Sequence, residues 1–155
     1  MAKVEVFQVK LGGTATTDEI GRAWRDAGFY TNGCITQTNF PLNPHVIEDA
    51  TIGIIDPGCP FSAGEGLRFL EVGGLMRPTY EHALRFVEQH GGTMNGNKDK
   101  PYIIFLHEPV LVPHGIRHVL YVSRNPDYRR ISLCYYGDKF VDLCVLAGVC
   151  PRSPR

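Results

Sequence analysis

The residues best suited to chemistry lie in one short stretch, HEPVLVPHGIRH, at positions 107–118. Imidazole groups bind zinc and iron, and both histidine and glutamate act as general acids and bases. A metal site in this stretch would use His107, His114 and His118. A catalytic or binding pair would use Glu108 and His118. An ordinary hairpin is the leading interpretation of the stretch.

The loop of this hairpin decides how far apart the histidines lie. If the loop is the two residues His114–Gly115, His107 and His118 share one face of the sheet but lie about 13 Å apart along the strands. One ion does not bridge that distance, because its ligand atoms must lie about 2 Å from it. Pro109 cannot donate to the ladder, and a bulge there would turn His107 in another direction.

A three-residue loop, Pro113–Gly115, gives a different pairing. His118 then pairs with Val110, and the alternation of side chains sends His107 to the opposite face. Glu108 becomes the diagonal neighbour of His118, at about 7 to 8 Å between Cα atoms, which long side chains bridge. This register predicts a hydrogen bond between Glu108 and His118, either as an oriented general base or as a surface polar pair.

A second candidate is the sequence GGT at Gly12, Gly13 and Thr14, between a predicted strand and a predicted helix. Backbone N–H groups at the start of a helix attract anions, so these residues are candidates for holding the phosphate of a cofactor. The segment lacks both the GxGxxG spacing and the lysine of a P-loop. A plain strand-to-helix turn is the leading interpretation, and no cofactor is predicted.

Strand and helix signals alternate through the first part of the chain. KVEVFQVKL at 3–11 is rich in β-branched residues and stops at a glycine pair, as a strand does. TTDEIGRAWRDAG follows, with a capping box of Thr16 and Glu19 and apolar residues at helical spacing up to Gly28. LRFLEVGGLM at 67–76 predicts another strand, and RPTYEHALRFVEQHGG predicts a second amphipathic helix that ends at Gly91.

The segment 29–66 gives only fragmentary signals. Asn43 and Pro44 favour a short helix through Ala50, TIGII favours a short strand, and CPFSAGEG favours an exposed loop. We therefore expect this segment to be irregular and rich in loops.

The C-terminal part is typical of β-structure. Four apolar runs at 102–112, 116–123, 129–136 and 139–146 are separated by the turn signals PHG, NPD and GD. Short connections join antiparallel neighbours, because parallel strands need a long crossover. The sequence predicts a single α+β domain over residues 1–155, in which a four-stranded antiparallel meander and N-terminal strands pack against the two amphipathic helices.

Composition and charge exclude several classes of protein. Hydrophobic residues make up 43% of the chain and charged residues 21%, which is typical of a folded domain and excludes a disordered one. The formal net charge is zero, which argues against binding to nucleic acid or anionic membranes through long-range attraction. An RNA-associated module would need a local set of arginines: Arg117, Arg124, Arg129 and Arg130.

The five cysteines are odd in number and widely spaced, and no two form a CxxC pair. This pattern favours free thiols in a reducing compartment. The chain shows no signal-peptide pattern and no apolar run of membrane-spanning length, so we expect a cytoplasmic protein. Cys134 and Cys144 lie in apolar runs and are expected to be buried, whereas Cys34, Cys59 and Cys150 fall in or near loops.

Three longer segments carry a resemblance: TTDEIGRAWRDAGF, LEVGGLMRPTYEHALRFVEQHGG and YIIFLHEPVLVPHGIRHVLYVSRNP. Their pattern resembles a group of small uncharacterised proteins from candidate-phyla bacteria, which share a helix ending in Gly-Phe and a strand of the type IAMEPI before a terminal meander. Glu108 and Pro109 match the Glu-Pro of that strand, which usually has no counterpart of His107. The resemblance implies a bacterial protein with this fold and implies no activity.

The leading hypothesis for function is a small non-catalytic interaction or ligand-binding module, because the chain has no spaced catalytic motif and no net charge. Its partner would be a protein or a small molecule, and a homodimer is allowed by the edge strands. The alternatives are a hydrolase or metal-dependent enzyme that uses the 107–118 hairpin, and the RNA-associated module.

Overall fold

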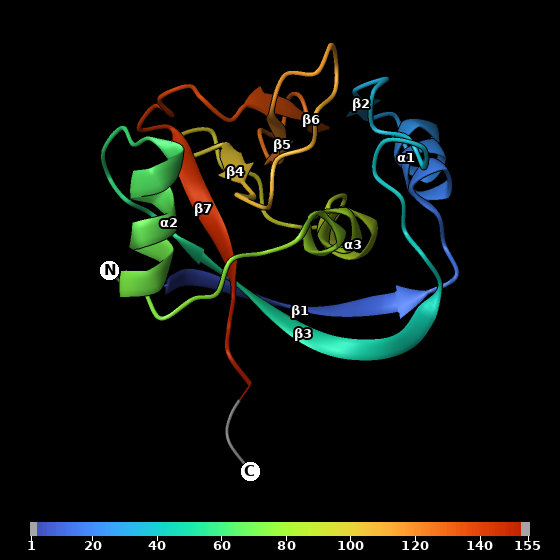
Figure 1. Cartoon of the computed structure of the whole chain (residues 1–155), viewed down its shortest axis with the longest axis horizontal. Coiled ribbons are helices and arrows are strands. Elements are labelled where there is room, and N and C mark those ends of the chain that lie inside the picture. Colours follow the sequence, from blue (N-terminus) through green and yellow to red (C-terminus); the bar gives the residue numbers. More distant parts are fainter. Residues whose placement is uncertain (1–2, 153–155) are drawn as a thin grey trace.

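Within residues 3–152, which the computed structural model describes, the chain forms three helices and seven strands (Figure 1). The helices are α1 (Thr17–Asp26), α2 (Ala63–Val72) and α3 (Tyr80–His90). The strands are β1 (Lys3–Gly13), β2 (Tyr30–Thr31), β3 (His45–Ile55), β4 (Tyr102–Ile104), β5 (His118–Ser123), β6 (Arg130–Tyr135) and β7 (Cys144–Val149).

The seven described strands form one mixed sheet in the order β1-β3-β7-β4-β5-β6-β2. The pairs β1–β3, β3–β7, β4–β5 and β5–β6 are antiparallel, whereas β4–β7 and β2–β6 are parallel. The sheet curls, so that β1 and β3 pass on one side of α3 while β4, β5 and β6 lie on the other (Figure 1). The α+β class predicted from the sequence is confirmed.

The two faces of the sheet carry different cores. On the inner side of the curl, α3 contacts β1 and β5, and this core includes Phe86, Ile103 and Leu120. On the outer side, α2 contacts β7, and this core includes Leu70, Ile104 and Leu146. Neighbouring residues of one strand therefore belong to different cores, because side chains alternate along a strand.

Helices α1 and α3 lie where the sequence predicts helices. Thr16 caps α1: the Glu19 N–H donates to its hydroxyl at 3.2 Å, and its own N–H donates to the Glu19 carboxylate at 3.2 Å. The N–H of Thr79 donates to His82 Nδ1 at 2.9 Å at the start of α3. None of the helices within residues 3–152 is long and apolar enough to cross a membrane.

Helix α2 corrects two predictions, the strand in LRFLEVGGLM and the exposed loop in CPFSAGEG. Its N-terminus is a capping box in which Glu65 N–H donates to Ser62 Oγ at 3.1 Å and Ser62 N–H donates to the Glu65 carboxylate at 2.9 Å. Glycines lower helix propensity and hide the signal. Gly66 is needed nonetheless, because a Cβ there would lie 2.6 Å from Leu106 Cδ1.

The prediction of an irregular segment at 29–66 is only partly correct. Residues 32–44 form neither helix nor strand, and TIGII at 51–55 is a strand as predicted, but the short helix after Pro44 is wrong. Strand β3 occupies His45–Ile55 and pairs with β1 along its length. Its residues from His45 to Asp49 are exposed, so no apolar periodicity marks them. Backbone pairing with β1, and not burial of apolar side chains, keeps this part of β3 extended.

The four-stranded antiparallel meander is only partly correct. Strands β4, β5 and β6 follow one another as antiparallel neighbours. Strand β7 instead lies on the far side of β4, parallel to it, and pairs with β3 on its other edge. The residues after Gly137 do not form a tight hairpin with β6. Phe140 first forms a β-bridge with Phe61, and the chain then crosses to β7.

The hairpin at 107–118 has the three-residue loop, since Val110 pairs with His118. The register differs further along the strands, where Ile104 pairs with Tyr121 and Phe105 N–H donates to the Leu120 carbonyl. The extra residues form a bulge beside Pro109, as predicted. The bulge turns His107 into the protein interior, where its ring contacts those of Phe40 and Tyr80 on the α3 side.

Candidate functional site

His107 holds this bulge closed. Its side chain is buried, with 1% of its surface exposed. Leu120 N–H donates to Nε2 at 3.0 Å, so Nε2 carries no proton, and Nδ1 donates to the Glu108 carbonyl at 2.6 Å. Burial lowers the pKa of His107 to about 4, so the ring is neutral. Both ring nitrogens are therefore engaged with the backbone, and neither faces a substrate or an ion.

The other residues of the stretch are not gathered around a common point. His114 is exposed at the tip of the loop, and His118 Nδ1 lies 2.9 Å from the Ile116 carbonyl. Glu108 is exposed and forms an ion pair with Arg77 at 2.8 Å. Within residues 3–152 no hydrogen bond joins Glu108 to His118, and no three His, Cys, Asp or Glu side chains are placed to share a metal ion.

The glycine turn at Gly12–Thr14 does hold an anion, but that anion is a carboxylate of the same chain. Gly12 N–H donates to Glu81 Oε2 at 2.9 Å. Gly12 has φ +85°, and a Cβ there would lie 2.5 Å from the Val46 carbonyl oxygen, so only glycine fits this close approach. The turn is therefore filled from within the protein.

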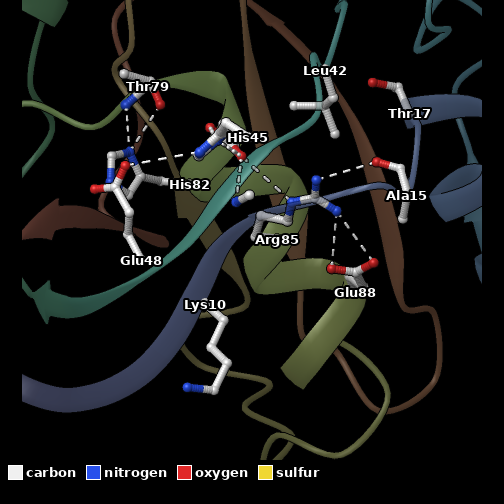
Figure 2. A network of polar contacts seen from close by, with 12 residues as sticks. Lys10, Ala15, Thr17, Leu42, His45, Glu48, Thr79, His82, Arg85 and Glu88 are labelled. Carbon is white, nitrogen blue, oxygen red and sulfur yellow. Dashed lines mark hydrogen bonds and ion pairs between the residues drawn. The ribbon is translucent and has the colours of Figure 1, made fainter.

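Glu81 is the centre of a polar network that joins β1, β3 and α3. Figure 2 labels three of the residues around it, His45, Arg85 and Glu88. His45 Nε2 lies 3.0 Å from Glu81 Oε2, and Arg85 Nε lies 3.6 Å from the same oxygen. Arg85 is buried, and it also donates to the Ala15 carbonyl at 3.2 Å and to Glu88 at 3.3 Å. We call these residues the Glu81 network.

The Glu81 network is better suited to holding the fold than to catalysis. The second nitrogen of His45, Nδ1, lies 3.0 Å from the Val46 carbonyl, so both ring nitrogens face acceptors and both donate. The hydrogen bond to Glu81 raises the pKa of His45, which favours the imidazolium. An imidazolium has no lone pair with which to accept a proton, so His45 is not placed as a general base.

Two of the four arginines considered for RNA binding are bound within the chain. Arg124 is buried and forms an ion pair with Glu5, and Arg129 donates to two backbone carbonyls after α3. Arg117 and Arg130 differ, because each packs against tyrosine rings instead.

Cys34, Cys59, Cys134 and Cys144 are free thiols, and two of them, Cys134 and Cys144, lie on the outer side of the sheet. Burial raises the pKa of Cys144 to about 11, and burial also raises the pKa of Cys134. Both therefore stay protonated at neutral pH, and a protonated thiol is a poor nucleophile.

We expect Cys59 to react with an aromatic disulfide reagent much faster than Cys134 and Cys144, because Cys59 is exposed. The measurement is the time course of thiol modification of native protein at pH 8, with Cys59→Ser as the control that loses the fast phase. Cys134 and Cys144 react at a comparable rate only after unfolding. A fast phase that persists in Cys59→Ser and maps to Cys144 contradicts this expectation.

Among the residues that the structure describes, hollows large enough for a small ligand include the following two. The first, of about 430 Å³, lies between α1 and α3 and is lined by Trp24. Its acidic and amide side chains each have a partner: Glu19 accepts from the Thr16 N–H, Glu88 accepts from Arg85, and Gln89 bonds to the backbone of β1. No lysine, arginine or histidine is among the residues that line this groove.

The second hollow, of about 400 Å³, lies on the outer face of the sheet beyond the part that α2 covers. Strands β4, β5, β6 and β7 form its floor, and residues 138–141 of the β6–β7 connection form one wall. Its strand residues on this face are Tyr102, Ile104, Tyr121, Arg130, Cys134 and Cys144. We call this hollow the sheet pocket.

Sequence reasoning did not find the sheet pocket. A signal exists in part, because alternation along β4 and β6 places Tyr102 with Ile104, and Arg130 with Cys134, on common faces. The order of the strands is the missing information. Only when β7 lies beside β4 do these side chains and Cys144 surround one space.

Comparisons with protein-family models, with curated proteins and with solved structures found no match to this chain. The assignment of a function therefore depends on the geometry described above.

Proposed function

We propose that the protein is a small non-catalytic binding module that holds a small-molecule ligand in the sheet pocket. The observation that carries this proposal is a concave, mostly apolar lining combined with one arginine, Arg130, that forms no hydrogen bond or ion pair with the described residues. Ligand sites typically combine an apolar lining with a few polar groups that fix orientation, in volumes of about 300 to 1,000 Å³. The groove between α1 and α3 has the volume, but no basic side chain lines it.

The state of the best-placed histidines and cysteines supports a role without catalysis. His45 and His107 use both ring nitrogens within the chain. Cys134 and Cys144 have raised pKa values because they are buried. Nucleophilic catalysis needs a nucleophile next to a base, and none of these four groups meets that condition. We also propose a cytosolic location, since the free thiols of Cys34, Cys59, Cys134 and Cys144 suit a reducing compartment.

The test is a fluorescence titration with phenylnaphthylamine, a neutral aromatic dye that brightens in apolar surroundings. Wild-type protein is expected to bind one equivalent, and Tyr121→Ala is expected to bind more weakly because it removes an aromatic wall of the pocket. Ala23→Arg is the matched control, since Ala23 is exposed and lines only the α1–α3 groove. Absence of saturable binding, or loss of binding only in Ala23→Arg, would refute the proposal.

A further inference from the structure

Arg130 is held in place by aromatic rings. Its Cζ lies 5.4 Å from the ring centre of Tyr121 and 5.1 Å from that of Tyr128. Both distances fall within the range of cation–π contacts. Tyr121 in turn contacts Tyr102 with ring centres 5.8 Å apart, so the aromatic contacts continue across the floor of the sheet pocket. The position of the guanidinium is therefore fixed by packing.

Arg130 nevertheless makes no hydrogen bond to another residue within the described part of the chain. A guanidinium has five N–H donors, and burying one without an acceptor is unfavourable. The Nε of Arg130 is buried and has no partner among the residues described, and Arg130 forms no ion pair there. Asp138 lines the same pocket but is not paired with it.

The buried arginines elsewhere in the fold show the contrast. Arg124 is paired with Glu5. Arg85 also has a buried Nε without a hydrogen bond, but Glu81 and Glu88 neutralise its charge. Arg130 lines a pocket and has neither an acidic partner nor a carbonyl among the described residues. Its buried Nε is closed to a ligand, but its two Nη groups are not among the buried atoms and can donate to an acceptor in the pocket.

We infer that Arg130 recognises the anionic group of a small aromatic or apolar acid whose body lies on the tyrosines of the sheet pocket. This inference rests on the proposed function and names its ligand class. The edge of a guanidinium matches a carboxylate, phosphate or sulfonate, which accepts two of its N–H groups at once. Lys139, at the wall of the pocket, adds a second positive charge.

A small acid fits this site better than a nucleic acid does. Nucleic-acid binding depends on several phosphate contacts at once. Of the four arginines considered for RNA binding, Arg124 and Arg129 already bond within the chain. The chain has no net charge to attract a polyanion. The positive charge at the sheet pocket is local, which suits one anionic group.

The test compares two dyes that share an aromatic body, anilinonaphthalene sulfonate and the neutral phenylnaphthylamine. In Arg130→Gln, we expect the Kd for anilinonaphthalene sulfonate to rise about tenfold, the value for one lost charge-assisted hydrogen-bonding pair. The Kd for phenylnaphthylamine is expected to change less than about twofold, because the aromatic floor remains. Arg117→Gln, which alters an arginine stacked on Tyr136 outside the pocket, is the matched control and leaves both values unchanged.

The outcomes separate the two proposals. If neither dye binds wild-type protein, the proposed function itself fails. If both dyes bind and Arg130→Gln weakens them equally or not at all, only the role of Arg130 is refuted. If Arg130→Gln does not fold, competition in the wild type decides: naphthoate should displace anilinonaphthalene sulfonate at about tenfold lower concentration than naphthalenemethanol, and equal potency overturns the inference. Tighter, steeply salt-dependent binding of oligouridylate would also overturn it in favour of RNA.

Discussion

His107→Ala is expected to lower the free energy of unfolding by about 3 kcal/mol or more, from an unsatisfied buried donor and a cavity together. The substitution leaves the buried Leu120 N–H without its acceptor and the Glu108 carbonyl without its donor. It also removes the ring that contacts Phe40 and Tyr80. Urea unfolding at pH 7 measures the change.

Two substitutions control this experiment. His107→Gln retains a donor and an acceptor in a side chain of similar reach and is expected to cost less than His107→Ala. His114→Asn changes an exposed histidine with φ 60°, a conformation that asparagine tolerates, and is expected to have no effect. An unfolding midpoint in His107→Ala equal to that of the wild type would show that the bulge does not depend on the ring.

The pH dependence of stability follows from the same residue. The pKa of His107 is about 4 in the folded protein and about 6.5 when unfolded, so the unfolded chain binds a proton that the folded one does not between these values. This contribution is fully present above pH 6.5 and is lost as the pH falls toward 4. It amounts to about 3 kcal/mol. The difference between wild type and His107→Gln across this range isolates it.

Glu81→Ala is the second change with a large expected effect, a loss of about 1 to 3 kcal/mol, because it removes the acceptor of the Gly12 N–H while Glu88 still pairs with Arg85. Arg85, whose side chain is 2% exposed, would lose the charge nearest its Nε. The Gly12 N–H and His45 would lose their acceptor as well. Glu81→Gln keeps an acceptor for Gly12 and is expected to cost less.

A titration of the His45 ring by NMR gives an independent readout of the Glu81 network. The hydrogen bond to Glu81 raises the pKa of His45, so this pKa should fall toward 6.5 in Glu81→Ala. The pKa of Glu81 is lowered, against the opposing effect of burial, by hydrogen bonds from Gly12 and His45. The contribution of Glu81 is therefore lost on acidification below 4.5, and that of His45 is lost as the pH rises above 6.5. An unchanged His45 pKa in Glu81→Ala would contradict the assigned contact.

These two changes affect the inner side of the curl, whereas the sheet pocket lies on the outer face. His107 and Glu81 connect distant segments of backbone, so the histidines and carboxylates that first suggested chemistry position the strands instead. The ligand site that we propose uses tyrosines and one arginine on strands that those contacts hold in place.

The local features of the chain were predictable where a signal lies within a few residues. The capping box of Thr16 and Glu19 correctly marked the start of α1, and the possible bulge at Pro109 was confirmed. The equivalent box of Ser62 and Glu65 at α2 was overlooked, because Gly64 and Gly66 beside it lower helix propensity. The three-residue loop was one of two alternatives, and only the paired backbone of Val110 and His118 distinguished them.

The sequence alone determined the α+β class and the positions of α1 and α3, because capping and apolar spacing act between residues that are close in the chain. Tertiary structure alone decided that β7 lies parallel to β4, that Glu81 fills the turn at Gly12, and that Arg130 faces a pocket without an acceptor. Each of these joins residues far apart in the chain. Such pairings depend on how the whole core packs, and no local pattern of residue types records them.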